Sequence, residues 1–325
     1  MPFFSAVVPD DFGDSMRLDK FVSFSQNGIS RSHLKGFLTS ILLNGNPSKL
    51  SAKVKSGDRI EIEWEDDVPS KIEPEDIPLS ILYEDENVTV VNKKQGMVVH
   101  PASGNWTGTL VSALLFRWGR EALSICDNAN NQAETLALRR PGIIHRLDKD
   151  TSGVIITARN RASEDFLQKQ FALRKNIVKE YVCICVGKLP YKAGKIELNI
   201  ERDKNDRKKF RATETNAGKK ALTLYSVIFS YSNGKETYSL VRVRIKTGRT
   251  HQIRVHLKSL GCPILGDPIY GKRPTGTFKS ATLMLHARYL KIPLPPLGNL
   301  IAFTAPLPPR FLKVMKVLRE NFNRE

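Results

Sequence analysis

The chain has 325 residues, a length that suits two or three domains, and 41% of them are hydrophobic, which is enough for real cores. Its 51 Lys and Arg exceed its 33 Asp and Glu, so the net charge is +18, which indicates a partner rich in phosphates. No apolar run reaches the ~18 residues that span a bilayer, and the N-terminus does not resemble a signal peptide. No segment shows a clear basic amphipathic helix for a membrane surface. We therefore expect a protein of the cytoplasm without membrane contact.

The cysteines and histidines show no metal-binding pattern. The four cysteines are Cys126, Cys183, Cys185 and Cys262. Two of them alternate on an expected strand, but no second pair follows at metal-ligand spacing, so we expect buried free thiols. The six histidines do not pair at ligand spacing either, and no metal is predicted.

The first 64 residues predict a short tail and a small domain. Residues 1–16 have no clear pattern and are expected to be a poorly structured tail. A helix is expected from Arg17 until Gly28, and Ser30 is expected to cap a second helix, which carries Leu34, Phe37, Leu38 and Ile41. Asn44-Gly45 is a turn signal, and Arg59–Trp64 alternates like a strand.

Two helices followed by a short β-hairpin, together with the stretches Arg17-Leu-Asp-Lys-Phe-Val and Val54-Lys-Ser-Gly-Asp, resemble the S4 RNA-binding domain over residues 17–64. This segment has eight Lys or Arg against four acids. We expect the basic set Arg17, Lys20, Arg31 and Lys35 to contact phosphates, although an ordinary solvated helix face is the alternative. The acidic, proline-rich residues 65–78 are expected to be a linker.

The remaining chain predicts a larger domain built around a charged loop. Two strands are expected in residues 79–93, and residues 119–140 are polar and asparagine-rich, as in a surface insertion. Ile143-Ile144 and Val154–Ile156 predict two short buried strands on either side of His145, Arg146 and Asp148. Such a loop either builds a functional site or is a charged surface turn.

The order of residues in this loop decides between these interpretations. His145-Arg-Leu-Asp-Lys-Asp-Thr-Ser-Gly153 resembles the signature of the RluA family of pseudouridine synthases. Further stretches resemble the family in the same order, and the first has the form of the RluD-like branch: Gly96–Asn105, Lys179-Glu-Tyr181, Gly248–Leu257, Leu260–Gly271 and Leu283–Leu290. The resemblance implies an α+β fold, with a catalytic domain over residues 79–325 whose bent, mainly antiparallel mixed sheet is flanked by helices.

The resemblance also assigns roles to residues. Asp148 corresponds to the catalytic carboxylate and Tyr181 to the aromatic residue of the active site. An arginine of the Gly248–Leu257 stretch pairs with the carboxylate in the family, and both Arg249 and Arg254 are available. We favour Arg254, because we expect it on a strand that holds it rigidly, and we expect it to grip the Asp148 carboxylate through two parallel hydrogen bonds.

RNA contacts are expected around this site. Arg146 is expected to fill the space that a flipped base leaves, and His145 and Arg249 are assigned to RNA contact beside it. Residues 202–220 carry eight Lys or Arg against three acids, and Arg207–Arg211 interleaves an aromatic residue with charge. This segment is either a strip for RNA or a solvated hairpin.

The expected function is the isomerisation of specific uridines in RNA to pseudouridine, which requires no cofactor. A stem-loop of large-subunit ribosomal RNA is the expected target; another ribosomal site or transfer RNA is the alternative. A different class, a non-catalytic S4-type RNA-binding protein, would be expected to have lost Asp148, Tyr181 or Arg254. A nucleoside glycosidase would need a second catalytic acid, and Asp150 is better explained as a loop charge. We expect a monomer that needs no protein partner.

Overall fold

The chain divides into two compact units, residues 1–71 and 72–325, in a computed structural model. The structure describes residues 3–10, 15–25, 38–64, 72–101, 105–119, 141–203, 206, 209–271 and 276–324. Each unit has its own hydrophobic core. Within the described residues, no helix combines the length and the apolarity needed to cross a bilayer.

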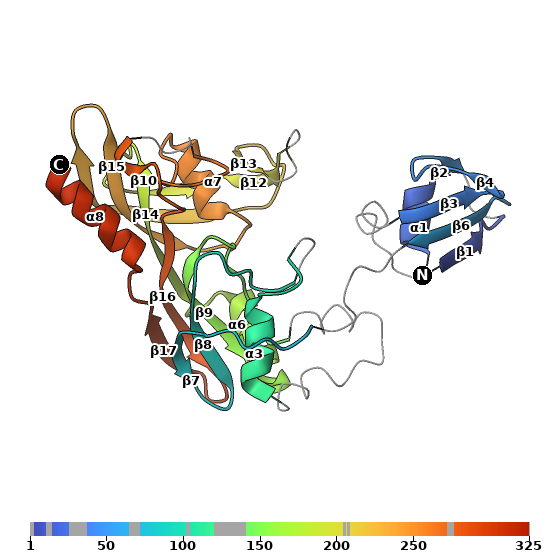
Figure 1. Cartoon of the computed structure of the whole chain (residues 1–325), viewed down its shortest axis with the longest axis horizontal. Helices are drawn as coiled ribbons and strands as arrows, with labels where there is room; N and C mark the ends of the chain where they lie inside the picture. The colour runs from blue at the N-terminus through green and yellow to red at the C-terminus, as the bar shows by residue number, and fades with distance from the viewer. Residues whose placement is uncertain are drawn as a thin grey trace. The chain divides into compact units, whose positions relative to one another are not determined.

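The first unit packs one helix on a small sheet (Figure 1). Its elements are β1 (Phe3–Val7), β2 (Met16–Arg17), α1 (Leu18–Phe24), β3 (Leu38–Leu43), β4 (Asn46–Pro47), β5 (Lys53–Val54) and β6 (Arg59–Trp64). The sheet has the order β1-β6-β3-β4, and β2 pairs separately with β5. Leu18 and Val22 of α1 are fully buried in one cluster with Ile60 and Ile62 of β6, because alternate residues of a strand face the same side.

Two expectations for this unit are corrected. Residues 3–7, expected to belong to a poorly structured tail, form β1, which pairs antiparallel with β6. Leu38 and Ile41, expected on a second helix, lie in β3; the run Leu-Thr-Ser-Ile-Leu-Leu includes the β-branched residues that favour strands. The start of that expected helix, with Arg31 and Lys35, falls outside the described residues. The turn at Asn44-Gly45 is confirmed, since both residues have positive φ.

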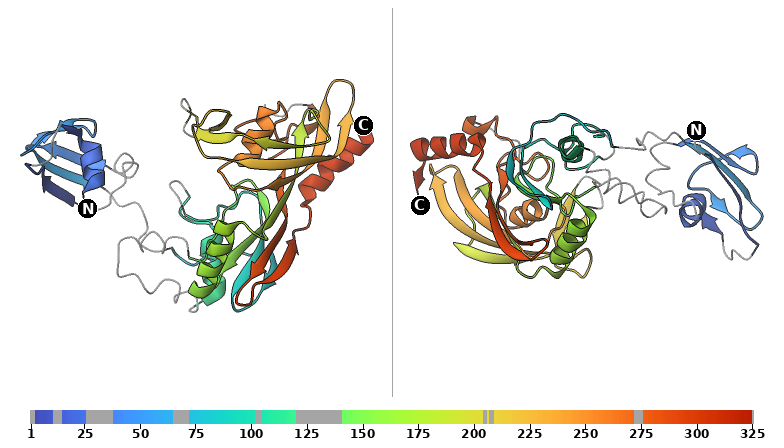
Figure 2. Two further views of the ribbon diagram at one scale, coloured as in Figure 1. Left: turned by 180° about the vertical axis from the view of Figure 1, so that it is seen from behind. Right: turned by 90° about the horizontal axis from the view of Figure 1, so that it is seen from below.

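The second unit is built on one large sheet (Figures 1 and 2). Its strands are β7 (Ile81–Glu84), β8 (Val88–Lys93), β9 (Ser152–Ala158), β10 (Val178–Val186), β11 (Ala193–Glu197), β14 (Leu222–Ser232), β15 (Thr237–Ile245), β16 (Leu285–Leu294), β17 (Asn299–Thr304) and β18 (Asn323–Arg324). The order is β11-β14-β15-β10-β16-β9-β8-β7, with β17 on β16 and β18 on β14. Among these pairs only β9 and β16 run parallel, so the expected mainly antiparallel α+β fold is confirmed.

Helices flank this sheet, and a small hairpin stands beside one of them. The helices are α3 (Leu110–Trp118), α6 (Arg161–Leu173), α7 (Gln252–Ser259), α8 (Pro309–Asn321) and the 3-10 turn η2 (Gly276–Phe278); the hairpin is β12 (Asn199–Arg202) with β13 (Phe210–Thr213). Helices α3 and α6 lie beside the half of the sheet that contains β7, β8 and β9, whereas α7 lies beside the other half, next to the hairpin (Figure 1).

Strand β16 joins the two halves of the sheet. One edge of β16 pairs with β10 along residues 285–291. It also pairs with β9 at His286 and Ala287, and then with β17 from Tyr289 onward. Close packing at the β9 contact depends on Gly153, which has φ 118° and whose added Cβ would lie 2.2 Å from the carbonyl oxygen of Ala287. The charged loop before β9 therefore opens where the two halves meet.

Three boundaries differ from expectation. Ile143 forms only an isolated bridge to Thr157, so Val154–Ile156, within β9, is the single strand of the expected pair. The expected linker ends early: residues from Ile72 onward belong to the second unit, where the Glu75 carboxylate accepts the backbone N–H of Gly108 at 2.9 Å. Gly119 ends α3, and the rest of the expected insertion, residues 120–140, lies outside the described residues.

Candidate active site

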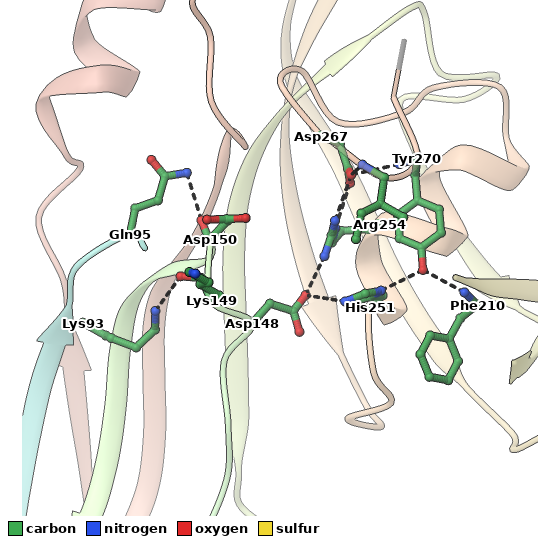
Figure 3. A network of polar contacts seen from close by, with 11 residues as sticks. Lys93, Gln95, Asp148, Lys149, Asp150, Phe210, His251, Arg254, Asp267 and Tyr270 are labelled. Atoms are coloured by element: carbon green, nitrogen blue, oxygen red, sulfur yellow. Dashed lines mark hydrogen bonds and ion pairs between the residues drawn. The ribbon is translucent and has the colours of Figure 1, made fainter. Parts of the chain in front are cut away.

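The loop that carries Asp148 is held by hydrogen bonds from Lys93, at the end of β8, and from the residues that follow it. Lys93 donates from Nζ to the carbonyl oxygen of Lys149 at 3.1 Å, and Gln95 donates from Nε2 to that of Asp150 at 3.0 Å (Figure 3). The backbone N–H of Gly96 also donates to the Lys149 oxygen, at 2.9 Å. Three donors thus fix the carbonyl groups of the two residues that follow Asp148.

Lys93 is an almost completely buried lysine whose amine is bonded inside the protein. Its three ammonium protons have three carbonyl acceptors, since Lys94 and Met97 accept at 3.1 and 2.8 Å in addition to Lys149. Burial lowers the pKa of Lys93 to about 7, although the charges of Asp148 and Asp150 act to raise it. Lys93 is therefore a buried amine beneath the loop that gains or loses its proton near pH 7, not an exposed RNA contact.

Arg254 connects Asp148 to a second, buried carboxylate. Its Nε and Nη2 donate to Oδ2 and Oδ1 of Asp267 at 2.8 and 2.9 Å, which is a two-pronged ion pair. The remaining Nη1 donates to Oδ2 of Asp148 at 3.2 Å (Figure 3). Burial alone would lower the pKa of Arg254, but hydrogen bonds and charge from Asp267, with a smaller contribution from Asp148, raise it above its ordinary value. Arg254 therefore stays charged and points one N–H at Asp148.

This geometry corrects two expectations about Arg254. It lies in the first turn of helix α7, not on a strand. Its two-pronged grip is on Asp267, whereas Asp148 receives a single hydrogen bond. The preference for Arg254 over Arg249 as the residue beside Asp148 is supported by the contacts, because Arg249 donates its Nε to the carbonyl oxygen of Lys220 at 3.1 Å.

A second chain of contacts reaches Asp148 from the β12–β13 hairpin. The N–H of Phe210 donates to the hydroxyl oxygen of Tyr270 at 2.9 Å, and this hydroxyl lies 2.7 Å from Nδ1 of His251. Nε2 of His251 lies 3.9 Å from Oδ2 of Asp148, too far for a direct hydrogen bond (Figure 3). Burial is the largest influence on the pKa of His251 and lowers it, so the imidazole is neutral at pH 7. Because Tyr270 already accepts from Phe210, its proton is free to bond Nδ1, which leaves the imidazole proton on Nε2, toward Asp148.

Tyr181 completes a cavity of about 390 Å³ around Asp148. It lies on β10 and is 8% exposed. Burial, and then the negative charge of Asp148, raise the pKa of its phenol, so the ring is neutral and protonated at pH 7. The volume falls within the range of about 300–1,000 Å³ that is usual for small-molecule pockets. The cavity brings together the three residues that the sequence assigned to catalysis: Asp148, Tyr181 and Arg254.

The residues assigned to RNA contact have different surroundings. Arg146 is exposed, and it lines the cavity together with Arg249 and His145. His145 stacks on Phe171 at 4.8 Å and accepts the N–H of Ile156 at its Nε2, so its ring also supports β9. Burial, with a smaller contribution from Lys179, lowers the pKa of His145 to about 3.

In the first unit, Arg17 forms two hydrogen bonds of 3.0 Å to the buried carboxylate of Asp19, whereas Lys20 is exposed. Asp148 and its cavity belong to the second unit.

Sequence reasoning missed four residues around the cavity: Lys93, His251, Asp267 and Tyr270. His251 and Asp267 are polar residues inside stretches that resemble the family, and this position was the signal that could have identified them. The resemblance itself assigned no role to either residue. Gln252 illustrates the same point, since its side chain joins the N–H of Arg249, the hydroxyl of Thr247 and the carbonyl of Leu222. Gln252 thereby shapes the turn that presents His251 and Arg254.

The cavity defines a class of protein: an enzyme that places one carboxylate, bonded to a buried arginine, beside a neutral tyrosine in a cavity of a strongly basic chain. Among the described residues, no cluster of three His, Cys, Asp or Glu side chains is arranged to hold a metal ion. The net positive charge of the chain suits a polyanionic substrate.

Comparisons with known proteins agree with this class. The sequence profile of the family described as RNA pseudouridylate synthase matches residues 87–259. The chain is 42% identical over 289 residues to ribosomal large subunit pseudouridine synthase D of Borreliella burgdorferi, covering 86% of this chain and 82% of that protein. It is 36% identical over 309 residues to the uncharacterized RNA pseudouridine synthase YlyB of Bacillus subtilis, covering 94% and 95%.

A solved structure of an RNA pseudouridylate synthase protein has a similar fold. The solved structure of human RNA pseudouridylate synthase domain containing 1 superposes with a TM-score of 0.54 at 26% identity, covering 76% of this chain and 89% of that one. The chain therefore belongs to the RNA pseudouridine synthase family, and it is an isomerase that acts on RNA.

Proposed function

We propose that this enzyme converts specific uridines of large-subunit ribosomal RNA to pseudouridine, with Asp148 as the catalytic carboxylate. The observation that carries the proposal is the single hydrogen bond from Arg254 to Asp148 inside the cavity. Relatives named ribosomal large subunit pseudouridine synthase D support the ribosomal target. Transfer RNA and other ribosomal sites are the alternative targets.

The reaction sets clear demands on the cavity. The bond between the sugar and N1 of uracil breaks, the base turns over, and the same sugar carbon bonds to C5, from which a proton then leaves. No hydride moves and no water is consumed. One carboxylate suffices, either as a nucleophile toward the sugar or the base, or as a base that removes a proton from the sugar.

Asp148 has the surroundings for these roles. Its side chain is 20% exposed, so it is open to a ligand in the cavity, and the charged Arg254 lies beside it. Tyr181, protonated and buried on β10, offers a flat ring for stacking on the uracil and a hydroxyl for proton transfer near C5. The reaction is shielded from solvent on the side of these buried groups.

The target uridine has to leave its base stack to reach this cavity, which costs a few kcal/mol. We propose that Arg146, the exposed cation two residues before Asp148, occupies the space that the base leaves. We further propose that the first unit is an S4-type RNA-binding domain, in which Lys20 contacts phosphates. Arg17 is a weaker candidate than Lys20, because its guanidinium already pairs with Asp19. We propose that the chain works as a monomer in the cytoplasm.

The test is to map pseudouridines in ribosomal and transfer RNA from a strain that lacks this gene. We expect one or more pseudouridines of large-subunit ribosomal RNA to disappear and to return when the wild-type gene is supplied. Loss of sites in transfer RNA alone would refute the ribosomal target and leave the chemistry in place.

Complementation with Asp148→Asn tests the catalytic carboxylate in the same experiment. We expect the variant to bind the RNA and to restore no site, because the amide is neither a base nor a nucleophile of comparable strength. Restored pseudouridine with Asp148→Asn would remove Asp148 from the mechanism.

A further inference from the structure

Lys179 and Arg174 stand out among the cations that line the cavity. Lys179 and Tyr181 are both on β10, two residues apart, so their side chains leave the same face of the strand. The rise per residue separates them by about 7 Å along the strand. That separation is comparable with the distance between the base and a phosphate of one nucleotide.

The surroundings of Lys179 contain no compensating acid among the described residues. Its Nζ lies 5.6 Å from the centre of the Phe171 ring, and a Cβ added to Gly248 would lie 3.7 Å from it. The charged or titratable groups that act on it are Arg174 and His145, and neither is an anion. The neighbouring acid, Glu180, leaves the opposite face of β10 and binds Arg244 at 2.5 Å. A half-buried ammonium beside a second cation is a favourable position for an anion.

Arg174 reaches the cavity from an unusual backbone position. It is the residue that ends helix α6, with φ 55° and its N–H bonded to the carbonyl of Gln170 at 2.9 Å. Glycine is the residue that this left-handed position favours. The chain instead places there a long cationic side chain that is exposed and lines the cavity. Retention of a side chain where the backbone disfavours one is typical of functional positions.

We propose that Lys179 and Arg174 form a subsite for one backbone phosphate next to the target uridine. The proposal rests on the proposed function, since it takes the cavity between Tyr181 and Asp148 as the place of the uridine. The ligand is a phosphodiester, a single negative charge with two free oxygens. The ammonium of Lys179 serves as a point charge and the guanidinium of Arg174 as a planar donor of two parallel hydrogen bonds. The subsite fixes the sugar that carries the reacting bond.

The experiment removes the charge either from the RNA phosphate or from the protein side chain that contacts it. The probe is a synthetic RNA stem-loop that contains a uridine modified by this enzyme in the mapping experiment. In two versions, the phosphate on the 5′ or the 3′ side of that uridine is a neutral methylphosphonate. The sugar on the 5′ side of each tested linkage carries 2′-O-methyl for chemical stability, and the matched all-phosphate RNA carries the same groups. Dissociation constants are measured for the wild type, Lys179→Met and Arg174→Gln.

We expect one methylphosphonate to weaken binding by the wild type by about tenfold, as the loss of a charge-assisted hydrogen bond does. The same replacement should weaken binding by Lys179→Met by only about threefold, because Arg174 alone is left to contact the phosphate. Arg174→Gln should show the same loss of sensitivity, and Lys179→Arg should regain part of it. If Lys179→Met does not melt cooperatively, Arg174→Gln alone decides, since Arg174 is exposed.

Lys175→Met is the matched control, because Lys175 is exposed and does not line the cavity. It removes the same charge and should keep the full sensitivity to the methylphosphonate. Equal sensitivity in Lys179→Met and in the wild type would overturn the subsite, and so would a wild type that is insensitive at both linkages. A wild type that neither binds nor converts the same stem-loop without 2′-O-methyl groups would instead refute the proposed function, and the subsite with it.

Discussion

Replacing Asp267 by Asn tests whether Asp148 is positioned from outside the cavity. The Asp267 side chain is completely buried, and four donors converge on it. Its Oδ1 accepts from Nη2 of Arg254 and from the backbone N–H groups of Ile269 and Tyr270, and its Oδ2 accepts from Nε of Arg254. These bonds and the charge of Arg254 lower the pKa of Asp267, although its burial acts to raise it.

The expected magnitude follows from this arrangement. An asparagine that keeps Oδ1 in place must turn its NH2 group toward Nε of Arg254, so one ionic hydrogen bond becomes a contact between two donors. Arg254 would retain only Asp148 as an ionic partner. Removing one member of a buried ion pair costs about 3–5 kcal/mol. For a domain of roughly this size, each kcal/mol lowers the melting temperature by about 2–4 °C, so we expect a loss of about 6–20 °C.

The assay combines thermal melting with the single-turnover rate of pseudouridine formation, measured at a temperature at which the variant is folded. We expect the rate of Asp267→Asn to fall by about 100-fold, since Arg254 no longer holds its orientation toward Asp148. Asp148→Asn is the control: its side chain is partly exposed and has one bond to Arg254, so it should melt much closer to the wild type. A variant Asp267→Asn with the melting temperature and rate of the wild type would refute the reasoning.

Other changes have distinct expected outcomes. Gly153→Ala should prevent the pairing of β9 with β16 and give a poorly folded protein by circular dichroism, because its Cβ would meet the backbone of Ala287; a normal melt would contradict this. Lys93 has its pKa lowered to about 7, so the folded state binds fewer protons than the unfolded state above that pH. The contribution of this group to the free energy of unfolding therefore rises with pH until the pH reaches the pKa of lysine in the unfolded chain. Between pH 7 and 10, the free energy of unfolding of the wild type should increase relative to that of Lys93→Met by up to about 1.4 kcal/mol per pH unit, as measured by urea titrations. Tyr270→Phe should speed hydrogen exchange at the N–H of Phe210 and slow the reaction, whereas unchanged exchange would argue against the link to the hairpin. Deleting residues 1–71 should leave a cooperative melt but weaken RNA binding, since the second unit has its own core.

Much of the fold was predictable because local patterns and packing agree. The helix at Arg161–Leu173 has its apolar residues at helical spacing, and the strand Arg59–Trp64 alternates buried and less buried residues. The motif around Asp148 and the distant residue Tyr181 were correctly predicted to meet, since both line one cavity. The family resemblance supplied that long-range information, which periodicity alone does not contain.

The wrong assignment of Arg254 to a strand has a physical cause. Ile253, Val255 and Leu257 alternate with polar residues, as on a strand whose one face is buried. In the structure this segment is a helix in which all residues from Gln252 to Leu257 are buried. A helix buried on every side has no exposed face, so its 3.6-residue period does not appear in the sequence. The strand Phe3–Val7 was missed for a related reason, since five residues are too few to show a period.

Arg254 bonds two carboxylates, Asp148 and Asp267, and the sequence identified only Asp148 as a site residue. The contrast between their surroundings explains this difference. Asp148 has one hydrogen bond and is 20% exposed, whereas Asp267 has four donors and no exposure. A group that reacts must change its contacts during the reaction, so a weak hold on Asp148 is compatible with catalysis. A group that positions another side chain must keep its own place, and the four hydrogen bonds to Asp267 hold it in place. The resemblance assigns the reacting role to Asp148, whereas the place of Asp267 becomes apparent only when helix α7 brings Arg254 between the two carboxylates.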